Sequence, residues 1–275
     1  MMKTALTIAG SDCSGGSSIQ ADLKTMTMNG VYGMSAITAL TAQNTTGITS
    51  VTEVSRAFLA EQLDAVFQDI RPDAVKIGLV VSSDLIDVIA EKLQKYDAKN
   101  IVMDLVLISS GGRQLISEEA LDTLTDELLQ LADVITPNIP EAEVLADMDI
   151  ESDEDMEAAA RKLHDMYGGS IVLKSGHHLP ENKDLLYTED DEVIWFHGLH
   201  PEERAGKHTP HGTGCTFSSA IAANLAKGYA LPDAVRRARD YVEDALEAEF
   251  HPGAGQAVMN HAFDLTGKYA EQPEE

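Results

Sequence analysis

Residues 5–28 read ALTIAGSDCSGGSSIQADLKTMTM, a short apolar run joined to an amphipathic stretch by a turn rich in glycine and serine. The apolar run at 5–9 predicts a buried strand, and the helical spacing of apolar residues in 19–28 predicts a helix. Strands that alternate with helices form a mostly parallel sheet covered on both faces, so we expect an α/β fold. The same pair of patterns recurs at 74–80 with 84–95 and at 101–107 with 118–131.

The second half of the chain continues this order. Two long helices are predicted near its end, one beginning at Thr213 and one running from Pro232 to about Glu249. Further strands, the last two of them forming a hairpin, are predicted at 134–136, 171–174, 185–187 and 193–196.

Length and composition indicate an ordinary soluble, globular protein. It has 275 residues, of which 44% are hydrophobic, enough to form a large core without disulfides or metal. No linker or repeat divides it, so we expect one domain over residues 1–265 and a polar acidic tail at 266–275. The two cysteines, Cys13 and Cys215, lie far apart, and the apolar run at the N-terminus is too short for a signal peptide. We therefore expect a cytoplasmic protein.

The charge balance excludes several classes of partner. Lysine and arginine number 20 against 46 aspartate and glutamate residues, a net charge of -26. Such a surface repels nucleic acid and anionic membranes, so neither is an expected partner. It also repels a nucleotide, so any nucleotide site needs local phosphate-binding groups and a divalent cation.

One short motif combines anion binding with a thiol. Residues 211–215 read HGTGC and open a predicted helix. Gly212 and Gly214 leave the backbone accessible, and the unpaired amides of a first helical turn attract anions. Cys215 lies at the same positive end, where we expect its thiol to ionise more readily and to accept a proton from a substrate hydroxyl. The alternative is a glycine turn beside an inert buried cysteine.

Polar residues also follow the predicted strands. In a parallel sheet, ligands bind beyond the carboxyl ends of the strands, so we expect these residues to converge. Each has a plain structural alternative: a carboxylate that caps a strand, a lysine that extends toward solvent, or a helix cap. The set comprises the loop 10–16, Lys76 to Gly78, Asp104, Thr136 to Glu141, and Lys174 to Gly176.

The usual nucleotide-binding motifs are missing from the sequence. Gly206-Lys207 lacks the leading glycine of a P-loop, since Pro201 stands at that position, and His208 replaces its serine or threonine. The glycines of the loop 10–16 do not follow the G-x-G-x-x-G spacing. We therefore interpret that loop as a flexible loop on the substrate side, not as a dinucleotide site.

Several of these segments together resemble a known family. The motifs are TIAGSD at 7–12, SGG at 14–16, IQADLK at 19–24, VYGMSAITALTAQNT at 31–45, TPNxxE at 136–141 and HGTGCT at 211–216. In this order they are similar to the hydroxymethylpyrimidine/phosphomethylpyrimidine kinases of thiamine biosynthesis, within the ribokinase superfamily. The resemblance implies a three-layer α/β/α fold, usually a homodimer. It also implies phosphorylation by Mg²⁺ and ATP of 4-amino-5-hydroxymethyl-2-methylpyrimidine and then of its monophosphate.

The resemblance also implies roles for individual residues. Asp22 and Gln43 match positions that contact the pyrimidine, with Gly10 near the same ring. Cys215 stands where many relatives carry an aspartate base, and the backbone of Gly212, Thr213 and Gly214 forms the anion hole. For the nucleotide and its metal, the matching residues are Asn138 and Glu141 for Mg²⁺ and its waters, Lys174 for the ATP phosphates, and Asp104 for the metal through water.

Departures from the family pattern leave other functions open. Ser17-Ser18 replaces a usual Ala-Gly, and residues 76–80 (KIGLV) and 104–107 (DLVL) replace KTGML and DPVM. One alternative is a pyridoxal or pyridoxine kinase, although Gln43 and the absence of a second cysteine at Ser109 argue against it. Another is a catalytically inactive relative that only binds the pyrimidine.

Overall fold

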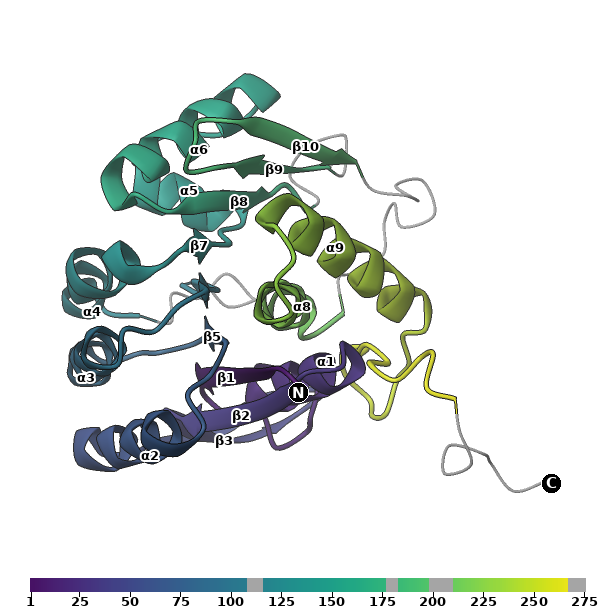
Figure 1. Ribbon diagram of the computed structural model, residues 1–275. Coiled ribbons are helices and arrows are strands. Elements are labelled where there is room, and N and C mark those ends of the chain that lie inside the picture. The colour runs from purple at the N-terminus through teal and green to yellow at the C-terminus, as the bar shows by residue number, and fades with distance from the viewer. Residues whose placement is uncertain (108–115, 177–182, 198–209, 267–275) are drawn as a thin grey trace.

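The computed structural model describes residues 1–107, 116–176, 183–197 and 210–266. Within them, an eight-stranded sheet runs through the middle of the molecule, and helices pack on both of its faces (Figure 1). The strands of the sheet are β1 (Thr4–Ala9), β2 (Tyr32–Ile37), β5 (Ala74–Ile77), β6 (Ile101–Met103), β7 (Val134–Ile135), β8 (Ser170–Lys174), β9 (Lys183–Tyr187) and β10 (Val193–His197). The expected α/β fold with a mostly parallel sheet is confirmed.

The strand order is β10-β9-β8-β7-β6-β5-β1-β2. Every neighbouring pair from β8 to β2 is parallel, whereas β9 and β10 form an antiparallel hairpin at one edge. Because parallel strands end at the same edge of a sheet, the segments that follow β1, β5, β6, β7 and β8 lie together.

Two layers of helices enclose the sheet (Figure 1). Figure 1 shows α2, α3, α4 and α6 on one side and α1, α8 and α9 on the other. The helices are α1 (Ser18–Met28), α2 (Arg56–Asp69), α3 (Ser83–Lys95), α4 (Glu118–Thr123), α5 (Ile139–Ala146), α6 (Asp153–Tyr167), α8 (Thr213–Ala226) and α9 (Leu231–Glu247).

Alternating side chains of each strand fill a separate core on each face. On β1, Leu6 and Ile8 pack with α2 and α3 in the larger core. Ala5, from the same strand, packs with the alanine-rich α8 and with α9 in the smaller core. The parallel strands are therefore apolar on both faces, which explains why their sequences appear as continuous apolar runs.

A second sheet, of two strands, follows β2 along the chain. It consists of β3 (Ala39–Asn44) and β4 (Gly47–Glu53), which are antiparallel. Leu40, Ile48 and Val51 are exposed on it. Unlike the strands of the central sheet, β4 has no buried residue.

Several predicted elements are shorter than their sequence patterns. The strands predicted at 74–80 and 101–107 end at Ile77 and Met103, because the residues after them turn into the loops at the sheet edge. The helix predicted over 118–131 is regular only to Thr123 and continues as π and 3₁₀ turns to Leu131. The strands β2, β3 and β4 and the helices α2, α5 and α6 were not predicted as elements.

Some of the predicted features lie outside the described residues. The predicted acidic tail lies outside the described residues from residue 267 onward, as do Pro201, Gly206, Lys207, His208 and Ser109. None of the helices that the structure describes is both long enough and apolar enough to cross a lipid bilayer.

Candidate active site

The N-terminus of α8 lies over the carboxyl ends of β6 and β8. Asp104 follows β6, Lys174 ends β8, and Lys174 Nζ lies 3.3 Å from Asp104 Oδ1. A Cβ atom on Gly214 would lie 3.5 Å from Asp104 Oδ2 and 3.8 Å from Lys174 Nζ. The structure therefore brings together three residues that the sequence places 40 or more positions apart.

Asn138 and Glu141 join this group from the start of α5. They form a capping box: Asn138 Oδ1 accepts the Glu141 amide at 2.9 Å, and Glu141 Oε2 accepts the Asn138 amide at 3.0 Å. Glu141 Oε1 also accepts the amide of Leu107 at 3.2 Å. Burial raises the pKa of Glu141, which the cation of Lys174 partly offsets. The helix-cap interpretation is confirmed, and the role of both residues at a metal stays a prediction.

Asp104 and Glu141 each supply a buried carboxylate beside Lys174. Mg²⁺ prefers carboxylate and water oxygens and usually takes only one or two carboxylates from the protein. Among the residues that the structure describes, no three histidine, cysteine, aspartate or glutamate side chains form a metal-binding group. The residues present fit a magnesium ion that is shared with phosphate oxygens and do not fit a dedicated transition-metal site.

A left-handed glycine begins the anion-binding turn. Gly212, at the N-cap of α8, has φ +92°, and a Cβ atom there would overlap the carbonyl oxygen of Gly16. The first intrahelical bond of α8 runs from the Thr216 amide to the Gly212 carbonyl at 2.9 Å. The amides of Thr213, Gly214 and Cys215 therefore precede the hydrogen-bonded ladder, as an anion site requires.

Cys215 lies in that first turn, where its side chain is partly exposed. Burial raises the pKa of Cys215 to about 12, and the cation of Lys76 and the backbone amide of Ser18 only partly offset this rise. The expectation that the helix terminus makes this thiol more readily ionised is wrong for this structure. Removal of the thiolate from water is the largest of these effects.

Lys76 and Asp22 form an ion pair beneath the thiol. Lys76 Nζ lies 3.0 Å from Asp22 Oδ2, and both side chains are 0% exposed. Asp22 also accepts the hydroxyls of Thr7 and Ser219, each at 2.6 Å. Burial alone would lower the pKa of Lys76, but the nearby negative groups, Asp22 first among them, raise it. Lys76 therefore supplies a permanent positive charge near Cys215.

This geometry corrects the expected position of Asp22. The residue was predicted to contact a substrate ring, but its carboxylate is enclosed in the interior and bonded on both oxygens. The Lys76 ammonium group and two hydroxyls compensate the charge of the Asp22 carboxylate. In this structure Asp22 is therefore the ion-pair partner of Lys76. The second expected residue, Gly10, is buried at the end of β1, where its carbonyl accepts the Ile19 amide at 3.2 Å.

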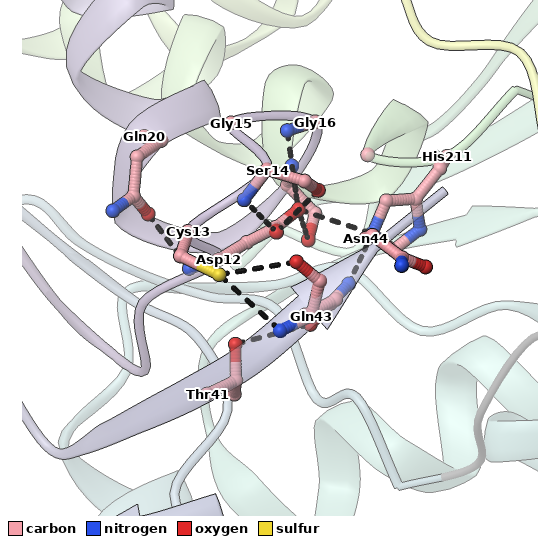
Figure 2. A network of polar contacts seen from close by, with 12 residues as sticks. Asp12, Cys13, Ser14, Gly15, Gly16, Gln20, Thr41, Gln43, Asn44 and His211 are labelled. Atoms are coloured by element: carbon pink, nitrogen blue, oxygen red, sulfur yellow. Dashed lines mark hydrogen bonds and ion pairs between the residues drawn. The ribbon is translucent and has the colours of Figure 1, made fainter. Parts of the chain in front are cut away.

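The third expected contact, Gln43, belongs to a network that the sequence did not reveal (Figure 2). Its side-chain amide lies 2.9 Å from Nε2 of His211, the residue just before the anion-binding turn. His211 Nε2 also lies 3.4 Å from Asp12 Oδ2. The sequence signal was only that Asp12 and His211 each stand inside a motif, which does not indicate that they meet.

Asp12 organises the loop between β1 and α1. Its two oxygens accept the amides of Ser14, Gly16 and Ser17 at 2.9, 3.1 and 2.9 Å. Burial would raise the pKa of Asp12, but hydrogen bonds from His211, Ser14 and Ser17 outweigh burial and hold that pKa well below its usual range. The loop is therefore an ordered structure around an ionised carboxylate, not the flexible loop expected from its glycines.

Comparison with known proteins assigns a family to this arrangement. The model of one family, described as phosphomethylpyrimidine kinase, matches residues 12–260. The chain belongs to the phosphomethylpyrimidine kinase family. It is therefore a phosphotransferase, and the expected family is confirmed.

Two curated relatives show the extent of the similarity. The chain is 42% identical over 259 residues to the hydroxymethylpyrimidine/phosphomethylpyrimidine kinase of Bacillus subtilis strain 168, covering 94% of each chain. It is 45% identical over 259 residues to the thiamine biosynthesis bifunctional protein ThiED of Geobacter sulfurreducens. That match covers 94% of this chain and 52% of the bifunctional protein, so the kinase spans about half of that relative.

Solved structures of similar kinases share the fold. A crystal structure of phosphomethylpyrimidine kinase from Clostridium difficile 630 superposes with a TM-score of 0.80 at 41% identity, covering 88% of this chain and 99% of that one. The ADP complex of Bacillus subtilis pyridoxal kinase gives a TM-score of 0.83 at 33% identity, covering 95% and 98%. Fold similarity extends to both groups of kinases, whereas sequence identity is higher for the phosphomethylpyrimidine kinases.

Two residues beside the site carry backbone strain. Ser18, one of the departures from the expected family pattern, has φ +54°, and Val106, which matches that pattern, has φ +40°. A β-branched residue rarely adopts a positive φ, and residues held in such conformations often lie at functional sites. Both lie beside the site, since Ser18 is next to Cys215 and Val106 precedes the residue that binds Glu141.

Proposed function

We propose that this kinase transfers a phosphoryl group from ATP to the hydroxymethyl oxygen of 4-amino-5-hydroxymethyl-2-methylpyrimidine, and then to the resulting monophosphate. One observation carries the proposal: the first turn of α8, the cation of Lys174 and the carboxylate of Asp104 meet around Gly214. Such a set can hold a phosphoryl group, balance its charge and leave room for attack in line with the bond that breaks.

The residues on the nucleotide side would neutralise the phosphate charge. The amides of Thr213, Gly214 and Cys215 would bind the oxygens of the transferred group, and Lys174 would contact the ATP phosphates. Asp104 and Glu141 would hold Mg²⁺, directly or through water, with Asn138 orienting Glu141. The cation, when bound, would add positive charge between the phosphates, which a protein of net charge -26 needs locally.

Cys215 would accept the proton of the substrate hydroxyl. Its raised pKa makes the thiolate a strong base although few molecules carry it at neutral pH. The cation of Lys76 would stabilise the thiolate as it forms. In phosphoryl transfer, alignment of the reactants and neutralisation of charge provide most of the lowering of the activation barrier. A base that is present as thiolate in only a small fraction of molecules is therefore compatible with turnover.

The substrate side favours an aminopyrimidine. An amide such as that of Gln43 can donate one hydrogen bond and accept another, which matches an exocyclic amine beside a ring nitrogen. Pyridoxal has no amine beside its ring nitrogen. Together with the higher identity to phosphomethylpyrimidine kinases, this supports the pyrimidine over pyridoxal as substrate.

A coupled assay that measures ADP release tests this function directly. Purified kinase receives ATP and Mg²⁺ with the pyrimidine alcohol, its monophosphate or pyridoxal in separate reactions. We expect turnover with both pyrimidines and a kcat/KM for pyridoxal at least 100-fold lower. Preferential turnover of pyridoxal would establish the pyridoxal kinase alternative, and binding of the pyrimidine without any turnover would indicate an inactive pyrimidine-binding protein.

We also propose that the kinase acts as a cytoplasmic homodimer. The β3–β4 sheet exposes apolar side chains on both faces, with Leu40 on one and Val51 on the other. Exposed apolar surface of this kind is often covered when copies of a chain associate. Both cysteines are free thiols, which suits a reducing compartment.

A further inference from the structure

The side-chain amide of Gln43 has two neighbours that decide which way it points. As drawn, Gln43 Oε1 lies 3.2 Å from Thr41 Oγ1, and Gln43 Nε2 lies 2.9 Å from His211 Nε2. Oxygen and nitrogen of an amide have nearly the same shape, so only the hydrogen-bonding network distinguishes them. The orientation matters because it determines which group Gln43 presents to each side.

The Thr41 hydroxyl settles one end of the amide. It has a single proton, which it donates to the carbonyl oxygen of Ser11 at 2.8 Å. Toward Gln43, Thr41 Oγ1 is then an acceptor, so its amide neighbour must be a donor. If Gln43 Oε1 pointed at Thr41, two acceptors would face each other. Hydrogen-bond chemistry therefore reverses the drawn assignment: the Gln43 atom near Thr41 is Nε2, and Oε1 is the atom near His211.

The Asp12 carboxylate settles the other end. It is fully buried, and hydrogen bonds keep its pKa well below the usual range, so it is ionised and only accepts hydrogen bonds. Since His211 Nε2 lies 3.4 Å from Asp12 Oδ2, that nitrogen carries a hydrogen. The same hydrogen points between Asp12 and the closer Gln43, which must then offer its oxygen. Both ends give the same orientation.

Three separate segments of the chain hold the His211 imidazole between Asp12 and Gln43 (Figure 2). Asp12 belongs to the β1–α1 loop and Gln43 to β3. The His211 amide donates to the carbonyl of Ala257 at 3.0 Å, and His211 pairs with Val258 in an isolated bridge. His211 also directly precedes Gly212 in the chain, while its backbone is held separately by the contacts with Ala257 and Val258.

We propose that His211 is a specificity-determining positioning residue, whose Nε2–H holds the Gln43 amide in the single orientation that recognises an aminopyrimidine. In that orientation Gln43 keeps one N–H and one lone pair for a ligand. An exocyclic amine donates to Oε1 while the adjacent ring nitrogen accepts from Nε2. Without the His211 donor, only the contact with Thr41 Oγ1 still favours this orientation. The reversed orientation, which faces donor to donor and acceptor to acceptor toward the pyrimidine, then becomes populated. This inference rests on the proposed function, because it concerns the substrate of that reaction.

Two variants of His211 and two substrates test the proposal. His211→Leu removes the donor, while His211→Gln keeps an N–H₂ group in its place. The substrates are the aminopyrimidine alcohol and 5-hydroxymethyl-2-methylpyrimidine, which lacks only the amine. We expect the native kinase to prefer the amine-bearing compound about 10- to 100-fold in kcat/KM, as a hydrogen-bonding site discriminates against a missing partner.

In His211→Leu we expect that preference to fall below about threefold, with the KM for ATP within twofold of the native value, and in His211→Gln we expect most of it to return. Equal losses for both substrates, or a raised KM for ATP, would make His211 a structural residue of the loop and overturn the proposal. So would full preference in His211→Leu.

A measurement without turnover separates this proposal from the proposed function. In ¹⁵N NMR of the native kinase, the imidazole signals that disappear in His211→Gln belong to His211. We expect them to show a hydrogen on Nε2. A neutral ring with its hydrogen on Nδ1 overturns the proposal even if the kinase phosphorylates the pyrimidine. If Nε2 is protonated and no pyrimidine is phosphorylated, the proposed function fails, and with it the specificity assigned to His211.

Discussion

The ammonium nitrogen of Lys76 lies 3.0 Å from Asp22 Oδ2 in the closed interior between β1, β5 and α8, and neither side chain is exposed. An ion pair in this position has lost its hydration on both sides, so each charge depends on the other. Because Lys76 also acts on Cys215, the pair connects the stability of the fold with the chemistry of the site.

Replacing one member of this pair is expected to destabilise the kinase strongly. In Lys76→Met the carboxylate of Asp22 stays buried without its cation, so the free energy of unfolding should fall by about 3–5 kcal/mol, measured by urea denaturation. The double variant Lys76→Met/Asp22→Leu should recover most of that loss but not the turnover, since the positive charge near Cys215 is still missing.

The exposed pair of Lys3 and Asp73, 2.7 Å apart, provides the control. Lys3→Met should change the free energy of unfolding by less than about 1 kcal/mol because water screens that pair. Similar losses in Lys3→Met and Lys76→Met would contradict the account given for the buried pair.

Two glycines with the same backbone conformation should respond very differently to alanine. Gly212 has φ +92° and Gly228 has φ +90°, but a Cβ atom at Gly212 would overlap the carbonyl of Gly16, whereas one at Gly228 meets nothing within 4 Å. Gly228→Ala should cost about 1–2 kcal/mol from strain alone. Gly212→Ala should cost more, and it should raise the KM for ATP because the first turn of α8 must move. Equal melting temperatures for the two variants would mean that the turn tolerates the clash.

Cys215 should be a slow nucleophile and a necessary base. With a pKa of about 12 it is a thiol at pH 8, so its alkylation by iodoacetamide should rise about tenfold for each pH unit up to that value. A Cys13→Ser background removes the exposed competing thiol. Rapid alkylation with a plateau near pH 8 would show instead that the thiolate is stabilised.

The matching kinetic prediction concerns Cys215→Ala. Phosphoryl transfer should slow by roughly 10²- to 10⁴-fold, the span usual for loss of a general base, while the KM for ATP stays close to native. Near-normal turnover would leave catalysis to the amides and the metal ion.

Glu141 and Asp104 should control the magnesium requirement. In Glu141→Gln the side chain retains only one acceptor for the amides of Asn138 and Leu107, and the site loses a negative charge. We expect the Mg²⁺ concentration for half-maximal rate to rise about tenfold or more, and a similar rise in Asp104→Asn.

Glu143→Gln is the matched control for this prediction, because Glu143 is on the same helix and also accepts a backbone amide, that of Ile150 at 3.0 Å. Its Mg²⁺ dependence should match that of the native kinase. A shift of the same size in Glu143→Gln would assign the effect to α5 as a whole.

The proposed homodimer can be tested on the β3–β4 sheet. Val51 and Val144 are exposed to nearly the same extent, 53% and 51%, but Val51 lies on that sheet and Val144 on α5. Val51→Asp should lower the molar mass in light scattering from two chains to one, and Val144→Asp should not. A native protein that elutes as a single chain would remove the proposal.

Much of the fold could be predicted from local patterns. The strands at β1, β5, β6 and β8 are continuous apolar runs because both their faces are buried, and the helices α1, α3, α8 and α9 keep helical spacing. The strands β3 and β4 escaped prediction because their sheet is largely exposed, so it has no clear apolar face to mark it. The sequence pattern predicted a helix from residue 118 to 131, but only its first part is a regular α-helix. The π and 3₁₀ turns that follow change the apolar spacing too little to be recognised in the sequence.

The candidate site, like the fold, could be predicted from the sequence only in part. The sequence by itself determined the order of strands and helices, the residue types at the strand ends and the small residues that open α8, because these follow from periodicity and local backbone geometry. Only the tertiary structure decided that Asp22 is enclosed with Lys76, that the thiol of Cys215 resists ionisation, and that Asp12, Gln43 and His211 meet. Burial and hydrogen-bond partners depend on segments up to 199 residues apart, counted from Asp12 to His211, and no local pattern specifies them.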